Sequence, residues 1–280
     1  METYTITEEK ITEFGASLHA EERSAGTIDK YLRDIRNFAS WLKEAELTIE
    51  AAIGWKETLV QGEYNPTTVN SMISALNTFL NFIGMDCKIR FLRVQKKLFR
   101  DENKELTREE YQKLIATAKD MKKERLALLI ETIGATGIRV SEVPYITVET
   151  AKAGKTQIRL KGKIRVIMLP EKLRRKLLKY AKKNKITSGE IFLTKGGKPL
   201  SRKQIWAEMK SICENAGIPE SKVFPHNLRH LFARVYYRIY KDIAKLADLL
   251  GHSSIETTRI YLLSTGKEHA LQIEELGLVE

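Results

Sequence analysis

Apolar residues recur at three- and four-residue steps over much of this sequence, and this helical period is the strongest constraint on its fold. Between residues 27 and 42 the apolar positions fall on one face: Ile28, Tyr31, Leu32, Ile35, Phe38, Ala39 and Leu42. A second helix is expected to begin at Asn65-Pro66, because a capping side chain followed by proline favours a first helical turn. Gly84 marks its expected end. The amino-terminal region therefore predicts a helical module.

A short stretch follows the period of a β-strand instead. Between residues 156 and 169 apolar residues alternate on both sides of a Lys-Gly-Lys turn, with Ile158 and Leu160 before it and Ile164, Val166 and Met168 after it. Two such runs around a glycine-containing turn predict a β-hairpin. Residues 191–193 predict another short extended piece, and the remainder from Glu171 is mostly helical. The expected fold class is mostly α with a small β-sheet, an α+β arrangement.

The segment at residues 93–105, RVQKKLFRDENKE, changes character, because it is dense in charge and poor in apolar periodicity. It predicts an interdomain linker over residues 96–105, with a solvated surface loop as the alternative. Residues 1–95 would then form one domain and residues 106–280 a second. The second domain is expected to open with a helix, because Thr107 and Glu110 have the spacing of a capping box.

Composition narrows the classes of function. The 280 residues carry a net charge of +12, which favours an acidic partner such as nucleic acid. Apolar runs are too short for a membrane span and the amino terminus lacks a secretory pattern, so we expect a cytoplasmic protein without a membrane partner. The two cysteines, Cys87 and Cys213, form no C-x-x-C pair, and idle thiols are the simpler interpretation, with a disulfide as the alternative. The histidines form no zinc-ligand pattern with cysteine.

Four local motifs contain candidate catalytic residues. In chain order they are A-T-G-I-R-V-S-E at 135–142, L-K-G-K at 160–163, H-N-L-R-H at 226–230 and L-G-H-S-S-I-E-T-T-R-I-Y at 250–261. Each has a simpler structural explanation on its own: a surface arginine, a turn lysine, a solvated helix face, a helix cap or a packed tyrosine. Together they supply groups suited to a phosphodiester. Guanidinium groups bind its oxygens at two points, imidazole and lysine can move protons, and a tyrosine hydroxyl can act as a nucleophile.

The order R…K…H-x-x-R…H…Y, with these local contexts, resembles the tyrosine recombinases and integrases. The amino-terminal S-A-G-T-I-D-K-Y-L-R-D-I-R-N-F-A-S-W-L is similar to the family's core-binding domain, a helical module that clamps the far side of the duplex. The resemblance therefore covers nearly the whole chain. It implies a helical, SAM-like DNA-binding domain at 1–95 and a catalytic domain at 106–280 with a carboxy-terminal tail helix.

The resemblance also implies a role for each matching residue. Arg139 and Arg229 would hold the scissile phosphate, and Tyr261 would attack it and leave a 3′-phosphotyrosine. Lys161 would protonate the departing 5′ oxygen, with Lys163 as the weaker candidate. The remaining residues have supporting roles: His226 in proton transfer at the nucleophile, His252 in hydrogen bonding to the phosphate, and Glu142 in orienting the site. No cofactor or metal is expected.

Two features depart from the family pattern, although neither replaces a catalytic residue. Pro144 follows Glu142 closely and is expected to shorten the helix there. The residues after Tyr261, Leu262-Leu263-Ser264, lack a histidine sometimes found in the family. The core-binding pattern begins within the first thirty residues, so a separate arm-binding domain is not expected.

The implied partners are double-stranded DNA with a specific recombination site and three further copies of the chain, in a homo-tetramer formed on DNA from free monomers. After Tyr261, a tail containing His269, Ala270, Ile273 and Leu276 predicts a short helix that needs a surface, on its own domain or on a neighbouring protomer. Integration or excision of a mobile element and resolution of DNA dimers both remain open. The alternatives outside recombination are a type IB topoisomerase and a catalytically idle DNA-binding relative.

Overall fold

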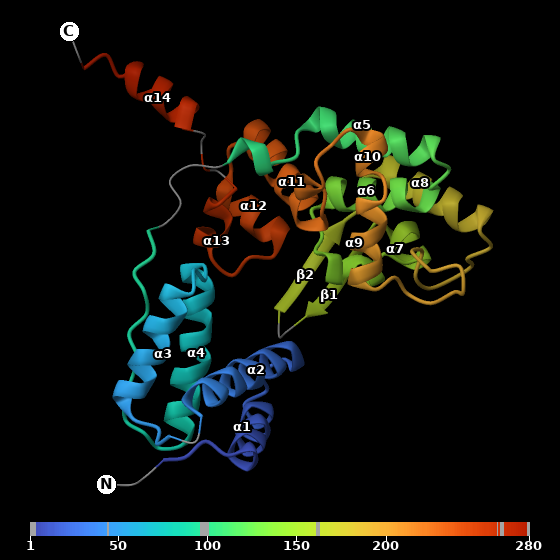
Figure 1. The fold of residues 1–280 in the computed structure, drawn as a ribbon. Coiled ribbons are helices and arrows are strands. Elements are labelled where there is room, and N and C mark those ends of the chain that lie inside the picture. The colour runs from blue at the N-terminus through green and yellow to red at the C-terminus, as the bar shows by residue number, and fades with distance from the viewer. Residues whose placement is uncertain are drawn as a thin grey trace. The chain divides into compact units, whose positions relative to one another are not determined.

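The computed structural model describes residues 4–43, 45–95, 101–160, 163–261, 263 and 266–278. The chain divides into two compact units, Met1–Lys96 and Lys97–Glu280, which we call unit 1 and unit 2. In the described ranges the regular elements are helices and one two-stranded sheet, which confirms the predicted fold class (Figure 1). Within those ranges, none of the helices combines the length and the apolar character that crossing a bilayer requires.

Unit 1 is a group of helices (Figure 1), and they surround an apolar core. Its helices are α1 (Glu8–Ala20), α2 (Ala25–Leu42), α3 (Ile49–Gln61) and α4 (Pro66–Phe82). Helix α4 begins where the sequence predicts, because the Asn65 side chain accepts a hydrogen bond from the backbone N–H of Thr67 at 3.0 Å and proline occupies the first turn. The buried Phe14, Phe38 and Phe79 lie on three different helices and fill the space between them.

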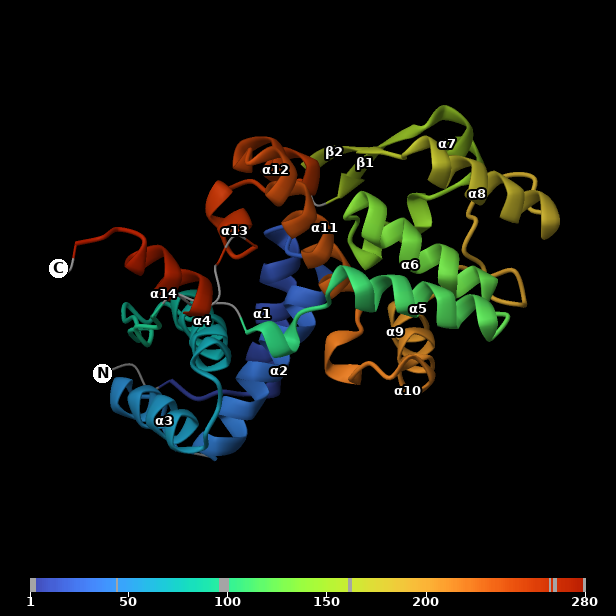
Figure 2. The same ribbon diagram turned by 90° about the horizontal axis from the view of Figure 1, so that it is seen from above.

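Unit 2 contains the remaining elements. They are η1 (Glu102–Lys104), α5 (Arg108–Asp120), α6 (Glu124–Thr136), η2 (Val140–Tyr145), α7 (Val148–Ala153), β1 (Lys155–Leu160), β2 (Lys163–Met168), α8 (Glu171–Lys183), α9 (Arg202–Lys210), α10 (Cys213–Ala216), η3 (Glu220–Lys222), α11 (Pro225–Tyr240), α12 (Ile243–Leu250), α13 (Ile255–Arg259) and α14 (Gly266–Glu274). Helix α5 starts with the predicted capping box of Thr107 and Glu110. Helix α6 packs against α5, α11 and α8 (Figure 2).

The predicted β-hairpin is present, with β1 antiparallel to β2 and Ile158 opposite Arg165. Its buried apolar residues are Ile158 and Ile167. The alternating apolar residues of β2 lie on the other face and are 49–59% exposed: Ile164, Val166 and Met168. Because side chains alternate along a strand, Arg165 points to the buried face with Ile167. The apolar face of β2 therefore borders the pocket described below and does not form the core.

The remaining expectations concern short segments of unit 2 and the two cysteines. Residues 191–193 follow the isolated bridge between Thr147 and Glu190, and Leu193 forms a second isolated bridge with Pro199. The element after Arg139 is a 3₁₀ helix that contains Pro144 and ends at Tyr145. Both cysteines are free thiols, and the pKa of each is raised, chiefly by desolvation.

Candidate active site

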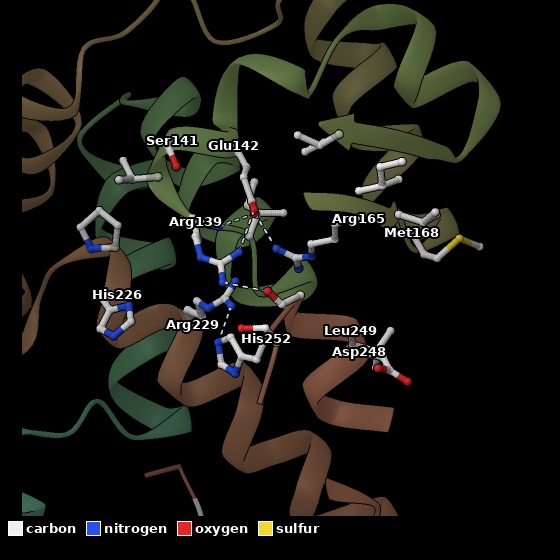
Figure 3. Close-up of a pocket in the computed structure, with 18 of the residues that line it drawn as sticks. Arg139, Ser141, Glu142, Arg165, Met168, His226, Arg229, Asp248, Leu249 and His252 are labelled. Carbon is white, nitrogen blue, oxygen red and sulfur yellow. Dashed lines mark hydrogen bonds and ion pairs between the residues drawn. The ribbon is translucent and has the colours of Figure 1, made fainter. Parts of the chain in front are cut away.

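Segments that are far apart in the sequence converge on one pocket of unit 2, with a volume of about 1160 Å³. Helix α11 packs against α6 and α12, and α12 contacts β2, so the ends of these elements meet. The pocket is lined by five of the predicted site residues: Arg139, Glu142, His226, Arg229 and His252 (Figure 3). Arg165 also lines it, and this residue was not among the predicted site residues.

Arg229 is the most buried of the cationic residues, with 1% of its surface exposed. Its Nη1 donates to the carbonyl oxygen of Gly137 at 2.5 Å and its Nη2 to that of Leu250 at 2.6 Å. Both carbonyls lie at helix ends, where backbone oxygens lack helical partners. Desolvation, and then the charges of Arg139 and Arg165, lower the pKa of Arg229 to about 10. The guanidinium therefore keeps its charge at neutral pH and is held rigidly.

Arg139 follows the left-handed Gly137 and is anchored by a buried carboxylate. Glu142 is 2% exposed, and its Oε2 accepts from the Arg139 backbone N–H at 2.8 Å while its Oε1 accepts from Arg139 Nη1 at 3.1 Å. Arg139 Nη2 donates to the carbonyl oxygen of Gly251 at 3.2 Å. The Arg139 side chain remains 40% exposed, so its guanidinium has an open side toward the pocket.

Arg165 donates from Nη1 to Glu142 Oε2 at 2.6 Å, so the carboxylate lies between two arginines (Figure 3). Desolvation lowers the pKa of Arg165, and the Glu142 charge opposes that shift. One carboxylate and three guanidinium groups leave this part of the pocket with excess positive charge, which suits a phosphodiester anion.

His252 is neutral and its tautomer follows from its partners. Its Nε2 lies 3.0 Å from Arg229 Nη2, and a guanidinium can only donate, so Nε2 accepts. Its Nδ1 then carries the proton and donates to the Thr258 hydroxyl at 2.9 Å. Desolvation is the largest cause that lowers the pKa of His252 to about 4, followed by the charge of Arg229.

Tyr261 lies beside the pocket and is 5% exposed. Its ring meets His230 edge to face with centroids 4.6 Å apart, and lies nearly parallel to His252 at 5.8 Å. His230 in turn lies 4.5 Å from His226. Desolvation is the largest cause that lowers the pKa of both histidines. The charges of His226 and then Arg229 also lower the pKa of His230, which falls to about 4. The charges of Arg229 and then Arg139 also lower the pKa of His226. His230 thus contacts both the Tyr261 ring and the His226 ring, and the sequence motifs did not predict this role.

Lys161 lies outside the described residues, and of Lys163 the structure describes the backbone in β2. In the described part of the chain, no three histidine, cysteine or acidic side chains are grouped as metal ligands. The local signal that could have identified Arg165 and His230 is their place in the sequence: His230 ends the motif at 226–230, and Arg165 lies two residues after the motif at 160–163. Each lies within four residues of a residue that was selected, Lys161 and Arg229 respectively.

Comparison with known proteins decides the family. The model of the phage integrase family matches residues 104–268, and that of its N-terminal SAM-like domain matches residues 11–84. The chain belongs to the phage integrase family. Among its curated relatives within this family of tyrosine recombinases, tyrosine recombinase XerA of Pyrococcus furiosus is 31% identical, with 100% of this chain and 98% of the relative covered. Tyrosine recombinase XerC of Roseiflexus castenholzii is 29% identical, with coverage of 86% and 85%.

Solved structures of the phage integrase family share this fold. A lambda integrase fragment, solved as a dimer on a core site, has a TM-score of 0.72 at 18% identity and covers 92% of this chain and 95% of its own. XerH recombinase in a post-cleavage complex with a palindromic difH substrate has a TM-score of 0.71 at 20% identity, with coverage of 96% and 89%.

Proposed function

We propose that this tyrosine recombinase cleaves and rejoins DNA through Tyr261, with the scissile phosphate held between Arg139 and Arg229. The observation that carries the proposal is the pair of anchored guanidinium groups in one pocket, with the phenol of Tyr261 packed against the neighbouring histidines. Attack of the phenolic oxygen on phosphorus forms a 3′-phosphotyrosine and expels the 5′ oxygen. The new ester keeps the energy of the broken bond, so rejoining needs no nucleotide cofactor.

The arginines stabilise the charge that develops on the non-bridging oxygens during attack. Fixed donors are effective here because they need no reorganisation during the reaction. Arg229 is fixed by two carbonyls and Arg139 by Glu142 and Gly251. Their cationic charge also provides the stabilisation that two-metal nucleases obtain from Mg²⁺, so the proposed mechanism uses no metal.

The histidines act as neutral imidazoles at neutral pH, because the pKa values of His226 and His252 are both lowered. His226 would accept the proton of Tyr261, which requires the phenol to move from its packed position beside His230. His252 Nε2 accepts from Arg229 in this state. It can donate to the phosphate only after it gains a proton or exchanges its Nδ1 proton for one on Nε2. The general acid for the 5′ oxygen would be Lys161, with Lys163 as the alternative.

The proposed partner is duplex DNA, which the net charge of +12 favours. Unit 1 would clamp the far side of the duplex, residues 96–105 would link it to the catalytic domain, and four protomers would assemble around two duplexes. A related lambda integrase has been solved as a tetramer bound to a Holliday junction, which supports this assembly. Integration of a mobile element and resolution of DNA dimers remain two possible roles of the same chemistry.

The carboxy-terminal tail is the proposed link between protomers. The described apolar side chains of α14 and the residues after it are more than half exposed: Leu271, Ile273, Leu276 and Leu278. A short helix with an uncovered apolar face gains stability by docking, and we propose that it docks on the neighbouring protomer.

Truncation after Thr265 tests this role of the tail. We expect the shortened chain to bind one half-site normally and to lose cooperative binding of the second protomer, together with recombination. A gel-shift titration on half and full sites, alongside a recombination assay, measures both. Unchanged cooperativity with full recombination would show that the tail belongs to its own domain.

Trapping covalent complexes on genomic DNA of the source organism, followed by sequencing of the attached DNA, tests the proposed function. A site-specific recombinase predicts reads that end at one sequence, at a chromosomal locus for dimer resolution or at element boundaries for integration. Dispersed ends with relaxation of any supercoiled plasmid would indicate a type IB topoisomerase. The absence of covalently attached DNA would indicate a catalytically idle DNA-binding relative.

A further inference from the structure

We infer that Arg165 is a positioning residue of this site, which fixes the guanidinium of Arg139 through the buried carboxylate of Glu142 and the backbone of Gly251. The inference rests on the proposed role of Arg139 as a phosphate clamp. It assigns a function to a β2 residue that lies outside the proposed set of catalytic groups.

The first observation is the shared carboxylate. Glu142 Oε2 accepts from both the Arg139 backbone N–H, at 2.8 Å, and Arg165 Nη1, at 2.6 Å. Glu142 and Arg165 are 2% and 7% exposed, so this ion pair is shielded from water. A buried ion pair fixes its partners strongly, because breaking it leaves an uncompensated charge.

The second observation is the contact between Arg165 and Gly251. The carbonyl oxygen of Gly251 accepts from Arg139 Nη2. Gly251 has a φ of +63°, and a Cβ added there would lie 2.6 Å from Arg165 Cδ. Arg165 therefore touches both residues to which the Arg139 side chain is bonded, Glu142 on one side and Gly251 on the other.

The electrostatic consequence concerns the direction of Arg139. With Arg165 present, the negative charge of Glu142 is divided between two cations. Without Arg165, Glu142 would attract Arg139 alone, and that guanidinium would turn away from a bound phosphate. The Nε of Arg165 is buried and has no hydrogen-bond partner among the described residues, so the described polar contact of this side chain is the one to Glu142.

The test compares cleavage of two substrates at the DNA site found by trapping. One carries the normal phosphate, and the other a methylphosphonate, in which a methyl group replaces one non-bridging oxygen and removes the charge. We expect Arg165→Met to slow single-turnover cleavage of the normal site by about 10- to 100-fold, by analogy with the loss of a residue that orients a metal ligand. The defect should be smaller on the neutral substrate, because Arg139 then has less negative charge on the phosphorus group to stabilise.

Arg165→Lys should recover part of the loss, since it keeps the charge and gives up the planar fork. This variant also keeps the inference testable if Arg165→Met does not fold, because its remaining defect must likewise shrink on the neutral substrate. Arg175→Met serves as the matched control, because Arg175 is exposed on α8 and pairs with Glu171 in the same helix. It should cleave both substrates at the normal rate. In the background of Arg139→Met, Arg165→Met should cause no further loss.

The outcomes distinguish the positioning role of Arg165 from the phosphate clamp of the proposed function. If Arg139→Met is relieved on the methylphosphonate while the Arg165 variants lose equally on both substrates, or lose additively with Arg139→Met, the positioning role of Arg165 is overturned. If Arg139→Met itself shows no relief, the phosphate clamp of the proposed function is wrong. Relief for the variants of both residues supports both statements.

Discussion

The two units of this protein bury different kinds of side chain. In unit 1 the described core is apolar, and its buried charge is Asp34, which pairs with Lys30 on the same helix. Unit 2 has an apolar core as well, but it also buries Glu142, Arg165 and Arg229 around one pocket. Taking charges out of water costs free energy, so such a cluster adds little to the stability of a fold. The difference indicates that the core of unit 1 serves its stability. In unit 2 the buried charged residues serve the reaction and lower the stability of the fold.

A core substitution in unit 1 should produce the largest effect, and that effect should fall on stability. Phe79 is fully buried and meets Phe14 edge to face with ring centroids 5.2 Å apart. We expect Phe79→Ala to lower the unfolding free energy of unit 1 by about 3–5 kcal/mol, because it removes a ring and leaves a cavity. Calorimetry should show one transition shifted down and the transition of unit 2 nearly unchanged. Phe91→Ala, at a 47% exposed position of the same unit, is the control with a small effect. A similar fall in both transitions would contradict the division of the molecule into unit 1 and unit 2.

A substitution at the pocket should instead affect the reaction. We expect Arg229→Met to slow DNA cleavage about 10²- to 10³-fold, or about 2.7–4 kcal/mol in the barrier, as for loss of one fixed donor to a developing oxyanion. Single-turnover cleavage at saturating protein measures this loss after circular dichroism has shown a folded variant. Arg175→Met, which removes an exposed arginine paired with Glu171 on α8, is the matched control and should cleave normally. Equal cleavage by the two variants would contradict the assignment of chemistry to this pocket.

A smaller effect is expected from pH. The pKa of His230 is lowered from 6.5 to about 4, so the folded chain resists protonation that the unfolded chain accepts. The stability linked to His230 is therefore complete above pH 6.5 and is lost as the pH falls from 6.5 toward 4, by at most about 1.4 kcal/mol per pH unit. Denaturant titrations of His230→Gln should show a weaker pH dependence in this window. His19→Gln, at an exposed position on α1, should leave the slope of the parent chain unchanged. An unchanged slope in His230→Gln would contradict the desolvation of this partly buried imidazole.

The sequence predicts the features that depend on local spacing. The start of α4 at Asn65-Pro66, the capping box of Thr107 and Glu110 and the β-hairpin are all present, because capping and alternation act over a few residues. The convergence of Arg139 and Arg229 followed from family resemblance and not from spacing, since it depends on α11 packing against α6.

Arg165 and His230 could not be assigned in the same way. The partner of Arg165 is Glu142, which belongs to another element, and no periodicity links β2 to η2. The alternation of Ile164, Val166 and Met168 even suggests a buried apolar face, whereas the structure exposes these residues and buries Arg165. His230 is defined by its contact with Tyr261, which requires the fold of the carboxy-terminal segment.

The proposed reaction depends on a covalent link between Tyr261 and DNA. Trypsin cleavage after Arg259 and Lys267 gives a peptide, Ile260–Lys267, with Tyr261 as its only tyrosine. After trapping on the cleavage site and nuclease digestion, mass spectrometry should find a nucleotide on this peptide, joined through a 3′-phosphate. Tyr261→Phe loses one hydroxyl and should bind DNA without forming an adduct. A nucleotide on another peptide, or an adduct that persists in Tyr261→Phe, would contradict the account.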